Sequence, residues 1–269
     1  LLDMGVDPNL IVWIKPRESW LNDRKGLQPE DFDGTGFAGL MFTQAKCVAE
    51  SESLDDMFNR LEASGSLLRI DQNIDPTMYR CATVSRAELE DLRKIQNVVR
   101  LGRVQSISPE KVVLDRGEFK CHGNSLFVNC SADGLERRPT TPIFAENKIT
   151  LQAVRPCQQS FSAAMIGYVE SMADDITRKN DLCRPTPHPD SHTDFLVFMN
   201  DILSAQLLWA SDEKLLSWLL ASQLDAITTH GLMDMLEGRG DMDGDAVMGL
   251  LQTASIKAAA YLEQAKALD

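Results

Sequence analysis

The stretch that decides the predicted fold contains LFVNCSADG, residues 126–134, and TLQAVRPCQQSFSAAMIGYVES, residues 150–171. The apolar run over residues 126–130 predicts a strand that ends at four small residues, Ser131, Ala132, Asp133 and Gly134. Small side chains and glycine let a flat or phosphorylated ligand approach the backbone, because they impose little or no Cβ barrier. A second strand, over residues 150–154, is then expected to lead into an apolar helix.

The predicted helix, residues 160–173, begins beside polar side chains. The residues at its mouth are Gln158, Gln159, Ser160 and Phe161. The first N–H groups of a helix have no intrahelical partner, and the helix dipole is positive at this end. We therefore expect the small-residue turn and the helix mouth to form a cradle for a ligand. The alternative is an ordinary buried strand and helix of an α/β domain.

An earlier apolar run, LIVWI over residues 10–14, has the β-branched content of a buried parallel strand. It ends at Lys15, Pro16 and Arg17. In a dinucleotide-binding unit the carboxyl end of such a strand meets the adenine ribose, where an acidic residue selects NAD and a basic residue accepts the 2′-phosphate of NADP. The basic residues here favour NADP, and Arg17 suits a two-point contact with phosphate. The alternative is a solvated strand end.

Together these stretches resemble the C-terminal part of flavoproteins with two dinucleotide-binding domains, the group that includes flavin monooxygenases and pyridine-nucleotide oxidoreductases. The resemblance implies that the turn at residues 131–134 closes over FAD and that the helix mouth at residues 158–161 points at the flavin ring. It also implies that Lys15 and Arg17 hold the 2′-phosphate of NADP. The resemblance covers roughly residues 1–175 and lacks both N-terminal GxGxxG fingerprints, so we expect the chain to be a truncated piece of a longer protein.

The remaining patterns predict further helices and a meander of strands. Helices are expected over residues 38–50, 54–63 and 86–95, the last opened by a capping box between Ser85 and Glu88. Strands are expected over residues 97–107 and 111–115. The predicted fold class is α/β: a partial Rossmann-like region over residues 1–175 with a meander of strands, followed by an all-helical C-terminal extension over residues 176–269. This extension would wrap the α/β part or form an oligomer contact.

Composition limits the classes of function. The formal net charge of −13 argues against non-specific nucleic-acid binding, which needs an excess of basic residues. No apolar run approaches the roughly 18 residues that cross a membrane, and the N-terminal residues do not form a secretory signal, so a cytoplasmic protein is expected. Six cysteines without a close pair are expected to be reduced thiols, namely Cys47, Cys81, Cys121, Cys130, Cys157 and Cys183.

A metal site is not expected, although one segment has suitable residue types. These are Cys183, His188, Asp190 and His192. Prolines lie between them and no second cysteine pair supports zinc. The expected function is therefore that of an NAD(P)H-dependent flavoprotein oxidoreductase, which passes hydride from nicotinamide to FAD and on to an unknown small-molecule acceptor. The alternative is a catalytically silent Rossmann-like binding or interaction protein with a helical docking tail.

Overall fold

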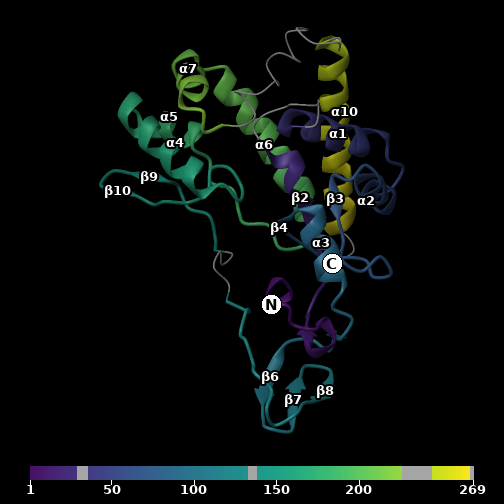
Figure 1. Cartoon of the computed structure of the whole chain (residues 1–269). Helices are drawn as coiled ribbons and strands as arrows, with labels where there is room; N and C mark the ends of the chain where they lie inside the picture. The colour runs from purple at the N-terminus through teal and green to yellow at the C-terminus, as the bar shows by residue number, and fades with distance from the viewer. Residues whose placement is uncertain (29–35, 133–137, 226–243, 267–269) are drawn as a thin grey trace.

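The computed structural model describes residues 1–28, 36–132, 138–225 and 244–266 (Figure 1). Across these ranges the chain mixes helices with strands, as the α/β prediction requires, and two of its strand pairs are parallel. The strands described form four small sheets, two with two strands and two with three.

The N-terminal segment begins with two 3-10 helices, Leu2–Met4 and Pro8–Leu10. Strand β1 (Trp13–Ile14) then pairs in parallel with β5 (Val98–Val99). The strand predicted over residues 10–14 is therefore parallel as expected, but it covers only Trp13 and Ile14, which are half-buried, and Leu10 is 78% exposed. The cause is local. Pro8 fixes its own φ and the Asp7 side chain caps the segment, and both favour a helical turn here.

A three-stranded sheet lies beside the first core. Its members are β2 (Ser19–Asp23), β3 (Leu67–Leu68) and β4 (Met78–Val84). Strand β2 lies in the centre, antiparallel to β3 and parallel to β4. Strand β4 carries an irregularity, because Trp20 faces Tyr79 whereas Asn22 faces Thr83, so one residue of β2 lies opposite three residues of β4. The middle residue of this bulge is Cys81.

Four helices surround the first hydrophobic core. They are α1 (Phe37–Glu50), α2 (Leu54–Ala63), α6 (Asp194–Ala210) and α10 (Gly244–Lys266). The apolar residues Met57, Phe58 and Leu61 recur at helical spacing and are buried on one face of α2. The predicted helix over residues 54–63 is confirmed. Helices α1 and α10 lie against each other, although they are close to opposite ends of the sequence (Figure 1).

Helix α3 (Arg86–Arg93) has the predicted capping box. The Ser85 hydroxyl accepts a hydrogen bond from the Glu88 N–H, and the Glu88 carboxylate accepts one from the Ser85 N–H. After this helix the strand predicted over residues 97–107 is divided into β5, which pairs with β1, and β6 (Val104–Ile107). Strand β6 forms an antiparallel meander with β7 (Lys111–Leu114), which matches the strand predicted over residues 111–115, and β7 pairs in turn with β8 (Gly117–Lys120), which was not predicted. This meander lies apart from the helices, at the bottom of Figure 1.

The expected strand over residues 126–130 was wrong. This segment is extended and solvated, with Leu126 88% and Val128 69% exposed. A strand needs a neighbour to pair with its backbone groups, and the described chain places none beside it. The predicted strand over residues 150–154 is also absent. A hairpin of β9 (Phe144–Ala145) and β10 (Lys148–Ile149) ends just before this segment.

A second core lies on the other side of α6. Its helices are α4 (Gln159–Met172), α5 (Ile176–Leu182) and α7 (Glu213–Ser222), and β9 packs with them. Phe161 and Met165 from α4 meet Trp209 and Leu215 there, so residues on both sides of the expected boundary at 175 share one core. Helix α6 contributes side chains to both cores and lies between the two groups of helices in Figure 1. Among the described residues, we find no helix with the length and apolar content that a membrane span requires.

Candidate functional site

The loop over residues 184–193 joins the two cores and organises the candidate site. At its C-terminal end it lies along β4, where the Tyr79 N–H donates to the Asp190 carbonyl at 3.1 Å. Met78 and Ser191 form an antiparallel bridge beside it. At its N-terminal end the Thr186 N–H donates to the Ala153 carbonyl at 2.8 Å, just before α4. The loop therefore contacts both β4 and the segment that leads into α4.

Arg17 is held by this loop. Its two terminal nitrogens donate to the Asp190 carboxylate at 2.9 and 2.7 Å, and the hydrogen bonding raises the pKa of Arg17. The Nε atom of Arg80 lies 3.6 Å from the same carboxylate. Asp190 is therefore shared by two guanidinium groups at a partly exposed position. A ligand phosphate could take the place of the carboxylate, because arginine binds either group through the same pair of N–H donors.

Lys15 and Arg100 follow the parallel strands β1 and β5 and lie at the same edge of that small sheet. The Nζ atom of Lys15 lies 2.5 Å from one Glu18 carboxylate oxygen, and Nε of Arg100 donates to the other at 2.8 Å. Glu18 is buried between them. Lys15 itself is only 7% exposed and lies over the ring of Trp13, so it is a buried, paired cation rather than a solvated strand end.

We call the region where the 184–193 loop meets β4 and the segment before α4 the junction. A disulfide joins Cys81 and Cys157 across it, and these residues are 76 positions apart in sequence. The expectation of six reduced cysteines was wrong for this pair, because sequence spacing does not show which residues the fold brings together. Both cysteines have left-handed backbone conformations, with φ of 57° and 63°. The Sγ atom of Cys157 lies 3.9 Å from Nδ1 of His188 in the 184–193 loop.

The mouth of α4 lies directly after this disulfide. Gln158 is the N-cap residue, its side chain makes no capping bond, and Gln159 and Ser160 are exposed. Phe161 differs from its neighbours, because it is 4% exposed and the centroid of its ring lies 5.5 Å from that of the Trp209 ring. Three of the four residues predicted at the mouth are thus accessible, and the fourth belongs to the core.

Only the first half of the predicted small-residue turn lies within the described residues. Ser131 and Ala132 are exposed in the extended segment, whereas Asp133 and Gly134 lie outside the described residues. Within the described chain, no hydrogen bond links Ser131 or Ala132 to the mouth of α4. The structure therefore brings Arg17 and the mouth of α4 to one loop, and within the described residues it shows no hydrogen bond between the predicted turn and that mouth.

Sequence reasoning missed the residues that connect the predicted positions. His188 and Asp190 were noticed only as weak metal candidates, and the described residues contain no cluster of three side chains suited to a metal ion. Arg80 and Cys81 carried no signal, because a bulge in a strand cannot be read from the alternation of one strand alone. A left-handed cysteine just before a helix likewise leaves no mark in the sequence.

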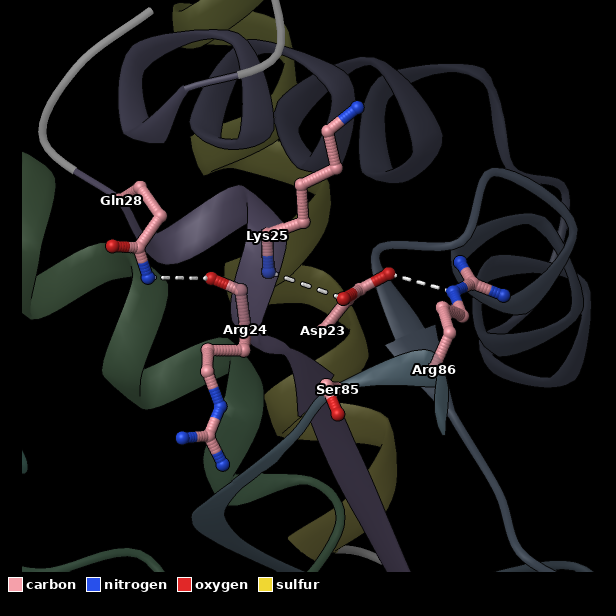
Figure 2. Close-up of a pocket in the computed structure, with 6 residues that line it drawn as sticks. All are labelled: Asp23, Arg24, Lys25, Gln28, Ser85 and Arg86. Atoms are coloured by element: carbon pink, nitrogen blue, oxygen red, sulfur yellow. Dashed lines mark hydrogen bonds and ion pairs between the residues drawn. The ribbon is translucent and has the colours of Figure 1, made fainter. Parts of the chain in front are cut away.

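A separate shallow pocket lies at the carboxyl ends of β2 and β4 (Figure 2). It is lined by Asp23, Arg24, Lys25, Gln28, Ser85 and Arg86. Its edge is basic, but two of its cations are already paired with carboxylates: Arg86 with Asp23 at 2.7 Å, and Arg24 with Glu88 at 2.8 Å. The Lys25 side chain points away from Asp23, while its backbone N–H donates to that carboxylate (Figure 2). We therefore place the candidate site at the junction and not here.

Comparison with known proteins identifies relatives of the chain. Uncharacterized proteins of Mycobacterium bovis and Mycobacterium tuberculosis are 44% identical to it over 267 residues, which cover 95% of this chain and 50% of each relative. The chain spans about half the length of these relatives. No protein-family model matches the sequence, and no solved structure matches it.

Proposed function

We propose that this chain is part of an NAD(P)H-dependent flavoprotein oxidoreductase, which transfers hydride from nicotinamide to FAD and then to a small-molecule acceptor. One observation carries the proposal. The 184–193 loop binds Arg17 through Asp190 and contacts Cys157 through His188, so a guanidinium suited to phosphate and the open mouth of α4 adjoin the same loop.

The residues at the junction fit the two cofactors in different ways. Arg17 would hold the 2′-phosphate of NADP in exchange for Asp190, while Lys15, buried against Glu18, would support the charge balance behind it. The exposed start of α4 at Gln159 and Ser160 offers backbone N–H groups and the positive end of the dipole, which favour negative charge on a reduced flavin. FAD would supply the hydride acceptor, and the protein would supply position and electrostatics.

The remaining part of the proposal is the Rossmann-like architecture and its FAD turn. Ser131 and Ala132 lie on a segment whose apolar side chains are exposed, which suits a strand that completes a sheet supplied by other residues. The mycobacterial relatives have about twice the matched length, which in those proteins leaves room for the glycine fingerprints that the resemblance implies.

The absorbance spectrum of a purified full-length mycobacterial relative tests this proposal. We expect flavin bands between about 350 and 500 nm, and oxidation of NADPH faster than of NADH. The chain described here, expressed alone, is the matched comparison and shows which cofactor contacts it makes without the remainder. A relative that binds no flavin after incubation with FAD, and that oxidises neither nucleotide, would overturn the proposal.

The second candidate is a catalytically silent binding or interaction protein in the cytoplasm, and exposed apolar side chains favour it. Leu126 and Leu151 are 88% and 70% exposed, and in the helical tail Leu207 and Ile256 are 57% and 65% exposed. Such side chains offer contacts for a partner or for a second copy of the chain. Sedimentation that shows a stable oligomer, together with a colourless full-length relative, would favour this candidate over the enzyme.

A further inference from the structure

We infer that Cys81 and Cys157 form a redox-active pair that exchanges electrons with small thiols and disulfides, with Cys157 as the attacking thiolate and Cys81 as the resolving thiol. This activity goes beyond the proposed flavoprotein function, because it requires neither flavin nor nicotinamide. The two cysteines lie on different segments, Cys81 in the bulge of β4 and Cys157 just before the mouth of α4, so their pairing is a property of the folded chain.

Cys157 has the surroundings of a reactive thiolate. It precedes Gln158, the N-cap residue of the 14-residue helix α4, and the Gln158 side chain makes no capping hydrogen bond. The Nδ1 atom of His188 is 3.9 Å from its Sγ atom, and Cys157 is half-buried, so reagents can reach it. A helix N-terminus and a neighbouring histidine both stabilise the thiolate form of cysteine. Of the charged groups nearby, Arg17 and Arg80 both pair with Asp190, and Arg184 of the same loop pairs with Asp181.

The backbone at both cysteines is strained. Left-handed φ values of 57° at Cys81 and 63° at Cys157 are unfavourable for residues with a Cβ atom. Cys81 reaches this conformation through the bulge, where three residues of β4 lie opposite one of β2. Conformations of this kind persist when the surrounding structure holds them, and they concentrate at functional sites. Here the strain is present at both ends of one bond, so its cleavage would allow both segments to relax.

The other cysteines have different surroundings. Burial raises the pKa of the Cys183 thiol to about 12 and also raises that of Cys47. These two thiols are therefore inert packing groups. Cys130 is an exposed free cysteine that lies in no helix or strand, and it serves as an internal reference for an accessible thiol.

The exchange balances without another reactant. The Cys157 thiolate attacks one sulfur of a small disulfide, forms a mixed disulfide and releases the other half as a thiolate, which takes a proton from water. The Cys81 thiolate then attacks the Cys157 sulfur, re-forms the protein disulfide and releases the second half as a thiol. Two electrons move from the dithiol to the substrate, and excess thiol reverses both steps.

Alkylation of the reduced protein tests the assignment of Cys157. The experiment uses the full chain, with Cys121→Ser to remove one background thiol, and follows the reaction of iodoacetamide at each cysteine by mass spectrometry at pH 7. We expect Cys157 to react several times faster than Cys130, and His188→Ala to slow Cys157 by about 3- to 10-fold, the effect of a pKa rise of up to one unit. His192→Ala is the matched control, because this histidine of the same loop faces Phe58 instead, and it should leave the Cys157 rate unchanged.

Reduction of a small disulfide tests the activity itself. The reduced wild-type protein should reduce one molecule of hydroxyethyl disulfide per protein and recover the Cys81–Cys157 bond. Cys157→Ser should abolish this reaction, and Cys81→Ser should stop at a mixed disulfide on Cys157. A Cys157 rate equal to that of Cys130, or a pair that stays oxidised in folded protein under excess dithiothreitol, overturns the inference. Both measurements on wild-type protein stand even where a variant fails to fold, and neither contains flavin, so the outcome is separate from that of the proposed function.

Discussion

Arg17 and Asp190, 173 residues apart in sequence, form a two-point ion pair with N–O distances of 2.9 and 2.7 Å. The pair connects the segment before β2 with the loop that precedes α6. The Asp190 backbone carbonyl also accepts a hydrogen bond from the Tyr79 N–H, so this one residue fixes the loop to both Arg17 and β4. The ion pair is therefore part of the joint between the first core and the mouth of α4.

Removal of either Arg17 or Asp190 should destabilise the folded protein moderately. Both side chains are about a third exposed, so we expect Arg17→Ala or Asp190→Ala to lower the free energy of unfolding by about 1 kcal/mol. Arg17→Lys should not restore the stability, because lysine cannot make the two-point contact. Urea unfolding of the single and double variants provides the measurement. Fully additive losses in the double variant would show that the two residues are not coupled.

The same arginine should affect nucleotide choice if the proposed function is correct. We expect Lys15→Ala with Arg17→Ala to weaken binding of NADPH by roughly 1 to 3 kcal/mol and to leave binding of NADH unchanged. Calorimetric titration of both nucleotides measures the difference. Arg24→Ala, on the separate shallow pocket, is the matched control. Equal affinities of the unmodified protein for the two nucleotides would contradict the prediction.

Asp201 should make stability depend on pH. Burial in α6 raises the pKa of this carboxyl to about 6, above its unfolded value of about 3.9. The folded state therefore holds the proton more tightly, so stability is greatest below the unfolded pKa and falls as pH rises through about 6. Because the side chain is half-buried, we expect a loss of only about 1 to 2 kcal/mol. Asp201→Asn should flatten this part of the profile and raise the melting temperature at pH 7. If the stability of the wild-type protein and that of Asp201→Asn change in the same way between pH 5 and pH 7, Asp201 is not the cause of the pH dependence.

Arg155 should be among the residues least tolerant of substitution. Its side chain is 1% exposed, pairs with the fully buried Asp225, and lies 4.3 Å from the centroid of the Phe161 ring. Removal of the guanidinium would leave Asp225 buried without this partner, so we expect Arg155→Ala to cost about 3 to 5 kcal/mol. The double variant with Asp225→Ala should lose less than the sum of the two single changes. Chemical denaturation of all three proteins decides this.

The sequence allowed prediction of elements whose signals are local. The capping box at Ser85 and the apolar face of the helix over residues 54–63 follow from neighbouring residues alone, and both were confirmed. Features that require distant partners were not predictable. The apolar run at residues 126–130 reads as a strand, but a strand forms only beside another strand. Likewise, nothing in the local sequence of Cys81 indicates Cys157 as its partner, because a bulge and a left-handed residue bring them together.

The C-terminal helix α10 should be essential for the first core. Ala258 and Tyr261 on this helix are buried in the first core, where α10 lies against α1 and α6, and the Tyr261 hydroxyl lies 2.9 Å from the Ser51 hydroxyl. Deletion of residues 244–269 should expose this core and give an aggregating protein, because the apolar faces of α1 and α6 that α10 covers would meet water. Tyr261→Phe keeps the ring and loses the contacts of its hydroxyl with the Ser51 hydroxyl and carbonyl, so it should cost only about 1 kcal/mol and remain soluble. Light scattering and thermal melts compare the three proteins. A soluble truncation with an unchanged melting temperature would show that α10 is an independent module and that the first core is complete without it.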